Sequence, residues 1–219
     1  FFPAAAVGWV ISDEAFMEDV DALSFLKLRA SYGITGNAGI DNFQYLGLLG
    51  SGANYAGDPG LVLSQLSSPN LSWEESVQFD LGLEYGFLND RINGTLAYYN
   101  KKNTDLLLSV PVSNTNGFTE FTQNTGEMLN EGIEFDISGE ILVGEFNWSV
   151  NANISTLHNE VTSLPDGEFV NGENLVREGE ALGSFYVREY LGVDAENGDA
   201  LFADEDGNPT SNYNAAPRK

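Results

Sequence analysis

The chain of 219 residues contains no cysteine and only one histidine, His158. Without cysteine it has neither a disulfide framework nor zinc-finger spacing, and one histidine cannot supply a multi-histidine metal site. No run approaches the roughly 20 apolar residues of a membrane-spanning helix, although barrel strands would hide their hydrophobicity in alternation. The chain opens on Phe1-Phe2-Pro3, with no initiator methionine or signal peptide. We therefore expect a fragment or processed piece whose targeting segment lies elsewhere.

Positive charge is also scarce. Nine lysines and arginines face 33 aspartates and glutamates, which gives a formal net charge of −24. Binding to nucleic acid needs a basic footprint for the phosphates, so this balance argues against a nucleic-acid partner. It argues equally against adsorption to anionic lipid. We expect most carboxylates to lie on solvated loops and on the polar faces of strands.

The stretch Asn70–Leu108 has the clearest pattern in the chain. Its first half alternates apolar residues with polar or small ones, and the apolar set is Trp73, Val77, Phe79, Leu81, Leu83, Tyr85 and Phe87. Side chains on a strand alternate between two faces, so one face is apolar and the other polar. Leu88–Arg91 reads as a tight turn, and a second alternating run begins at Ile92. The pattern predicts a hairpin with arms of about fifteen residues, longer than most soluble strands.

Similar alternation predicts strands before and after this hairpin. The eight expected strand segments are Phe1–Ile11, Ser24–Ile34, the two arms of the hairpin, Asn124–Leu142, Phe146–Val161, Gly183–Val193 and a strand beginning at Ala200–Ala203. Short links follow the odd-numbered strands and long links the even-numbered ones. The first short link, at Ser12–Met17, looks like a capped helical turn.

This parity of connections favours one fold class. Outer-membrane barrels have short periplasmic turns and long extracellular loops, whereas the links of a soluble sandwich need not sort by side. We predict an all-β, antiparallel, up-and-down transmembrane β-barrel with about eight strands in this chain, polar faces toward the lumen and apolar faces toward lipid. A closed eight-stranded barrel would be narrow, and the ragged ends favour an arc of a larger one. The alternative is a secreted or surface β-sandwich that binds carbohydrate and buries its apolar face against a second sheet.

No arrangement of acids suggests an enzyme. Glu74 and Glu75 are adjacent and would face opposite ways on a strand, so they cannot form a glycosidase pair. Asp80 and Glu84 share a face but would lie about 13 Å apart along it. His158 has no serine or cysteine partner in a triad pattern. We predict no catalytic residues.

The segment Asp204–Asn208 resembles the opening of a calcium loop. The bidentate glutamate at the twelfth position is missing, because Ala215 stands there. A plain Asp-Gly turn explains the segment better. We therefore predict no metal and no cofactor.

Several segments, taken in order, resemble the SusC/RagA type of TonB-linked outer-membrane transporters. The matching segments are FPAAAVGWVISDEAFM, LKLRASYGITGN, NLSWEESVQFDLGLEYGFLNDRINGTLAYYNKKNTDLLL, GFTEFTQNTGEMLNEGIEFDISGE, FNWSVNANISTLHNEVTSL and GVDAENGDALFADEDG. Together they cover most of the chain. Asn103-Thr104 departs from the family, which usually has a threonine and then a basic residue.

The resemblance implies a parent molecule in the outer membrane, with a plug domain inside a barrel of about twenty-two strands. It implies a segment that engages TonB, a lipoprotein lid of the SusD type, and import of a bulky glycan or peptide. Residues 1–219 would be partial barrel wall with extracellular loops near 35–69, 109–123 and 162–182. The plug and the TonB-contacting segment would lie outside this chain.

Aromatic residues in those loops are the candidate binding residues. They are Phe43, Tyr45, Tyr55, Phe118, Phe121 and Phe169. Aromatic rings beside Asn and Asp can stack on and hydrogen-bond to a sugar or peptide substrate. The same rings could instead pack the loops against one another or against the lipoprotein lid. The sequence leaves both roles open.

Overall fold

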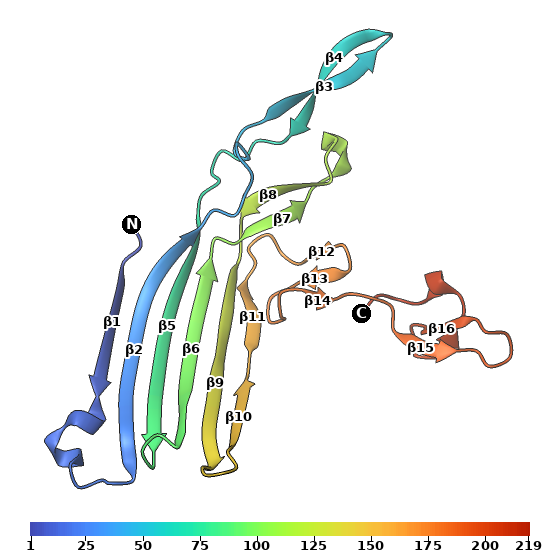
Figure 1. The fold of residues 1–219 in the computed structure, drawn as a ribbon. Helices are drawn as coiled ribbons and strands as arrows, with labels where there is room; N and C mark the ends of the chain where they lie inside the picture. The colour runs from blue at the N-terminus through green and yellow to red at the C-terminus, as the bar shows by residue number, and fades with distance from the viewer.

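The computed structural model describes all residues 1–219, and it consists of β-strands joined by loops and single 3₁₀ turns. Its main sheet, the wall, is long and gently curved (Figure 1). The wall strands are β1 (Ala4–Val10), β2 (Leu23–Asn37), β5 (Glu74–Phe87), β6 (Ile92–Thr104), β9 (Glu127–Leu142), β10 (Trp148–Ser155) and β11 (His158–Ser163). No helix in the structure has the length and apolar character that crossing a membrane demands.

The wall is antiparallel throughout, with the order β1-β2-β5-β6-β9-β10. β11 also pairs with β9, so β10 and β11 follow successive parts of one neighbour. Each strand therefore lies beside the next long strand along the chain. This confirms the predicted up-and-down antiparallel arrangement for the first six expected strands.

Strand register aligns the apolar residues into rows that cross the wall. One row runs through Trp9, Leu28, Leu83, Leu96, Phe135 and Ile154. On the opposite face, the row through Lys27, Glu84, Thr95, Asp136 and Asn153 is polar. Alternation in single strands has thus become one apolar and one polar face.

No second sheet covers the apolar face. Leu81, Ile133 and Ile154 are 40%, 50% and 66% exposed, although all three lie well inside the wall. A β-sandwich would bury these side chains between two sheets. The sandwich alternative is therefore wrong.

Glycines let large side chains lie flat against the wall. Tyr99 pairs with Gly132 across β6 and β9, and a Cβ added at Gly132 would lie 2.7 Å from the Tyr99 hydroxyl oxygen. Tyr85 covers Gly94 in the same way on the apolar face. Such tyrosine–glycine pairs fill the gap left by the missing side chain and pin the register of neighbouring strands.

The short connections lie at one end of the wall and the long ones at the other, called here the long-loop end (Figure 1). The predicted turn at Leu88–Arg91 joins β5 to β6, with positive φ at Leu88, Asn89 and Asp90. The expected capped helical turn between β1 and β2 was only partly right. Two 3₁₀ turns lie there, η1 (Ile11–Asp13) and η2 (Ala15–Met17), and neither has a side-chain cap.

The long connections contain strands of their own. β3 (Leu48–Tyr55) and β4 (Asp58–Gln65) form a hairpin that extends away from the wall (Figure 1). β7 (Leu107–Pro111), the turn η3 (Asn114–Asn116) and β8 (Glu120–Asn124) form a second hairpin. The expected second arm, which ran to Leu108, ends earlier in the structure. Asp105 has φ 54° and redirects the chain from β6 into β7.

The seventh and eighth expected strands are not part of the wall. Residues 183–193 break into β14 (Ser184–Phe185) and β15 (Tyr190–Val193), and β14 joins a small sheet with β12 (Phe169–Asn171) and β13 (Asn174–Val176). β15 pairs with β16 (Ala200–Ala203), which pairs with β17 (Pro209–Thr210) ahead of the turn η4 (Tyr213–Ala215). Between β14 and β15, Val187 exchanges two backbone hydrogen bonds with Lys219, and Gly192, with φ 120°, lies at a register shift inside β15.

The buried side chains gather at the long-loop end. Val161, Leu164 and Val176 form a small apolar core, against which Leu108 and Phe169 pack. Within the wall itself, several of the buried residues are glycines. The loops therefore have a packed base of their own, whereas the wall presents both of its faces to its surroundings.

Candidate functional site

Asn124, at the end of β8, holds two of the long connections together. Its side-chain oxygen accepts a hydrogen bond from the backbone N–H of Ser72 at 2.7 Å. Its amide nitrogen donates to the backbone carbonyl of Ser72 at 3.0 Å and to that of Asp105 at 2.9 Å. Through these hydrogen bonds Asn124 holds Ser72, just before β5, close to Asp105, just before β7.

Asp166 makes a similar link to the third connection. One of its carboxylate oxygens accepts hydrogen bonds from the Gln123 amide at 2.8 Å and the Thr125 hydroxyl at 3.0 Å. In the same connection, the Arg177 guanidinium donates to Glu168 at 2.6 Å. That hydrogen bond and the negative charge of Glu168 raise the pKa of Arg177. The loops are thus positioned mainly by polar contacts around a small apolar core.

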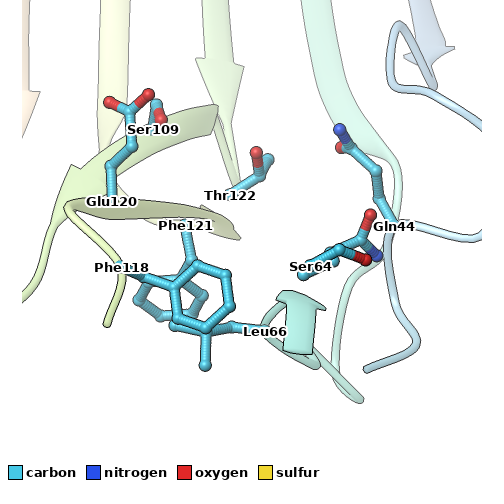
Figure 2. Close-up of a pocket in the computed structure, with 9 residues that line it drawn as sticks. Gln44, Ser64, Leu66, Ser109, Phe118, Glu120, Phe121 and Thr122 are labelled. Atoms are coloured by element: carbon cyan, nitrogen blue, oxygen red, sulfur yellow. The ribbon is translucent and has the colours of Figure 1, made fainter. Parts of the chain in front are cut away.

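An open cleft of about 180 Å³ lies between the base of β4 and the β7–β8 hairpin. Figure 2 shows its walls, with Gln44 and Ser64 on one side and the strand β8 on the other. The rings of Phe118 and Phe121 lie close to Leu66, on the opposite side of β8 from Ser109, Glu120 and Thr122 (Figure 2). The cleft thus combines an apolar end with a polar one.

The polar end carries one formal charge, the Glu120 carboxylate, together with the Ser109 and Thr122 hydroxyls. The Gln44 side-chain oxygen is buried and has no hydrogen-bond partner. Glu120 is exposed and takes part in none of the ion pairs of the structure. A buried acceptor without a partner loses the hydrogen bond it would make in water.

The structure brings two of the six candidate aromatics together in this cleft, Phe118 and Phe121. Phe43 and Tyr45 flank Gln44 in sequence and are 62% and 50% exposed. Tyr55 lies at the tip of the β3–β4 hairpin and is 87% exposed. Phe169 packs against the apolar core of the loops instead. The six residues therefore do not form one surface.

Gln44, Leu66 and Glu120 belong to the cleft but were not among the residues singled out from the sequence. Their three segments meet only because the long connections fold back on one another. No local pattern marks that meeting. The scarcity of lysine and arginine in these loops was the one signal that pointed to a cleft rich in acceptors.

The wall carboxylates are engaged in ordinary contacts. Asp80 accepts hydrogen bonds from the Ser31 hydroxyl at 3.1 Å and the Gln78 amide at 2.9 Å. Glu84 lies 3.4 Å from both Lys27 and Arg29. These contacts form a polar network across β2 and β5 and contain no nucleophile paired with a base.

The other two sequence candidates also have structural contacts. Asp204 accepts backbone hydrogen bonds from Asp206 at 3.0 Å and Asn208 at 2.8 Å, which is the pattern of a turn. His158 begins β11 and lies 3.2 Å from Glu160, its neighbour on the same face. No group of three or more His, Asp or Glu residues is arranged to hold a metal ion.

Comparison with known proteins decides the family. The model of the TonB dependent receptor-like β-barrel family matches residues 1–215. The chain belongs to this family. Its wall is thus a partial arc of the larger TonB-dependent receptor barrel, as the sequence predicted.

Named relatives agree with this assignment. TonB-dependent receptor SusC of Bacteroides thetaiotaomicron is 39% identical over 236 residues, which cover 95% of this chain and 23% of SusC. TonB-dependent receptor P3 of Formosa agariphila is 36% identical over 238 residues, which cover 95% of this chain and 24% of that receptor. The structure of the RagAB peptide transporter matches with a TM-score of 0.84 and 29% identity, covering 100% of this chain and 25% of that one. The chain therefore spans about a quarter of the relatives it matches.

Proposed function

We propose that this TonB-dependent receptor chain is the barrel portion of an outer-membrane transporter that imports a bulky nutrient, a glycan or a peptide. The observation that carries the proposal is the family match over residues 1–215. The exposed apolar rows of the wall support it, because such a face needs lipid around it. The parent molecule performs no chemistry on its cargo.

The wall would cross the membrane with its short turns on the periplasmic side and its long loops outside the cell. The apolar face of β5 runs from Val77 to Phe87, about 33 Å along the strand at the usual rise per residue. At the usual tilt of about 40° this corresponds to a band about 25 Å tall, the height expected for the apolar belt of an outer-membrane barrel.

The proposed partners follow from the family and from the geometry of the loops. A surface lipoprotein of the SusD type would cover the long-loop end, and a plug domain and a TonB-contacting segment outside these residues would supply gating and energy. The loops near 35–69, 109–123 and 162–182 would then face the lipoprotein and the cargo. No nucleic-acid partner is proposed, because the net charge of −24 repels phosphates.

The six loop aromatics would have different roles: contact with cargo, contact with the lipoprotein, and packing of the loops. Phe118 and Phe121 line the cleft and would contact cargo. Tyr55, at the exposed tip of the β3–β4 hairpin, would contact the lipoprotein, and Phe43 and Tyr45 flank the cleft residue Gln44 in sequence. Phe169 would support the loops from their core.

Uptake by cells tests this proposal. A strain that lacks the gene of the full-length protein should lose growth on one class of oligosaccharide or peptide, and the restored gene should return it. Loss of TonB should have the same effect, and the lipoprotein should co-purify with the full-length receptor. Uptake that persists without TonB would contradict the proposal.

A further inference from the structure

The cleft between β4 and β8 carries one formal charge, and that charge is negative. The Gln44 side-chain oxygen is buried and unbonded, and the Glu120 carboxylate has no cation beside it. The Ser64 hydroxyl donates its proton to the carbonyl of Leu48 at 3.2 Å, so toward the cleft it can only accept. The complement of such a surface is a ligand group that donates.

Positive charge is missing from both segments that build the cleft. Residues 38–73 and 105–126 contain no lysine and no arginine. An anionic ligand would therefore meet Glu120 without a compensating charge, and like charges brought together are unfavourable. This excludes carboxylated, sulfated or phosphorylated groups from the cleft and favours a cationic one.

The apolar end of the cleft suits the remainder of a basic side chain. Phe118, Phe121 and Leu66 lie together below β8 (Figure 2). Aromatic faces attract ammonium and guanidinium groups, and the methylene stem of lysine or arginine packs well on apolar surface. A sugar ring would also stack on phenylalanine and its hydroxyls could donate to Glu120, but it would bring no positive charge to the carboxylate.

The backbone beside the cleft is suited to a peptide. β8 hydrogen-bonds to β7 on one side only, so its other edge carries unpaired N–H and C=O groups. An extended peptide can add to such an edge, with main-chain hydrogen bonds that hold it and pockets that select its side chains.

We propose that this cleft is a subsite for a lysine or arginine side chain of an extended peptide, with Glu120 as the residue that selects its charge. The proposal rests on the transport function proposed above and narrows its cargo to peptides that carry a basic residue. Glu120 and the absence of nearby cations set the charge preference, whereas Phe118 and Phe121 supply apolar contacts that do not depend on charge.

Calorimetry with the full-length receptor and its lipoprotein tests this. The probes are three pentapeptides that differ only at a central lysine, alanine or glutamate, together with a neutral oligosaccharide of similar size. The lysine peptide should bind about tenfold more tightly than the alanine peptide, because one charge-assisted hydrogen bond contributes about that factor. The glutamate peptide should bind most weakly, and added salt should reduce the lysine preference.

The variant Glu120→Gln should bring the lysine peptide close to the alanine peptide and leave the alanine peptide unchanged. Glu145→Gln, in the exposed turn between β9 and β10 at the other end of the wall, is the matched control and should alter nothing.

Three results would overturn the proposal: equal binding of the lysine and alanine peptides, a lysine preference that survives Glu120→Gln, or tighter binding of the oligosaccharide than of any peptide. If one of them occurs while TonB-dependent uptake is intact, only the subsite assignment fails. If uptake itself does not depend on TonB, the transport function fails instead.

Discussion

Leu96 and Thr95 are neighbours on β6 whose side chains lie on opposite faces of the wall at nearly the same height. Leu96 belongs to the apolar row that crosses the sheet and is 44% exposed. Thr95 lies between Glu84 and Asp136 on the polar face. The two positions therefore allow the same substitution to be compared on the two faces.

If the apolar face contacts lipid, arginine should destabilise the protein much more at Leu96 than at Thr95. Leu96 pairs with Leu83, which lies four residues from the end of the band at Phe87. That is about 13 Å along the strand and about 10 Å of depth after tilt, close to the middle of a band about 25 Å tall. Leu96→Arg should therefore cost about 2–4 kcal/mol of folding stability. Thr95→Arg should cost much less, because two carboxylates face the new cation across the strands.

The measurement is the urea midpoint of each full-length variant refolded into lipid vesicles, together with the fraction that reaches the outer membrane in cells. Leu96→Arg should lower both values, and Thr95→Arg should leave both near those of the unmodified protein. Equal behaviour of the two variants would refute the assignment of faces. A soluble, well-folded Leu96→Arg protein would refute the membrane wall itself.

Three further substitutions test the packing of the chain. Gly132→Ala should destabilise the wall by about 1–3 kcal/mol, because its Cβ would collide with the Tyr99 ring and a neighbouring backbone oxygen; the urea midpoint reports this, with Gly139→Ala as the control that has room. Asn124→Ala removes three hydrogen bonds and should speed hydrogen exchange and proteolysis at the bases of the loops while leaving the urea midpoint of the wall unchanged. Val161→Ala should cost the loop core about 1–3 kcal/mol, which exchange rates in β11 and β13 would report.

The wall could be predicted from the sequence because the alternation of apolar and polar residues that marks its strands is a local pattern. Alternation in β5 and β6 shows which residues share a face, and the turn at Leu88–Arg91 sets the register between the two strands. The parity of the connections then places every long loop at one end. These features need no knowledge of contacts between distant segments, and the structure confirms them for the first six expected strands.

The loops could not be predicted in the same way. Residues 183–193 contain enough apolar residues to suggest a strand, but the residues between β14 and β15 pair with distant parts of the chain, Tyr186 with Glu173 and Val187 with Lys219. The cleft depends on Gln44 and Glu120, which come from different connections and meet through links such as the one made by Asn124. Side chains that hold two loops together carry no periodic signature in either loop.

Side-chain burial differs between the wall and the loops of this chain. The wall buries little side-chain surface of its own, because each of its faces is shaped for a different surrounding. The loops have their own small core around Val161, Leu164 and Val176, and this core lies where the strands end. Leu108 of β7 packs against this core, so the cleft hairpin is anchored at the end of the wall strand β11 as well as on the loops. A barrel of this construction can change the cargo that its loops select while the strands that cross the membrane keep their alternation and register.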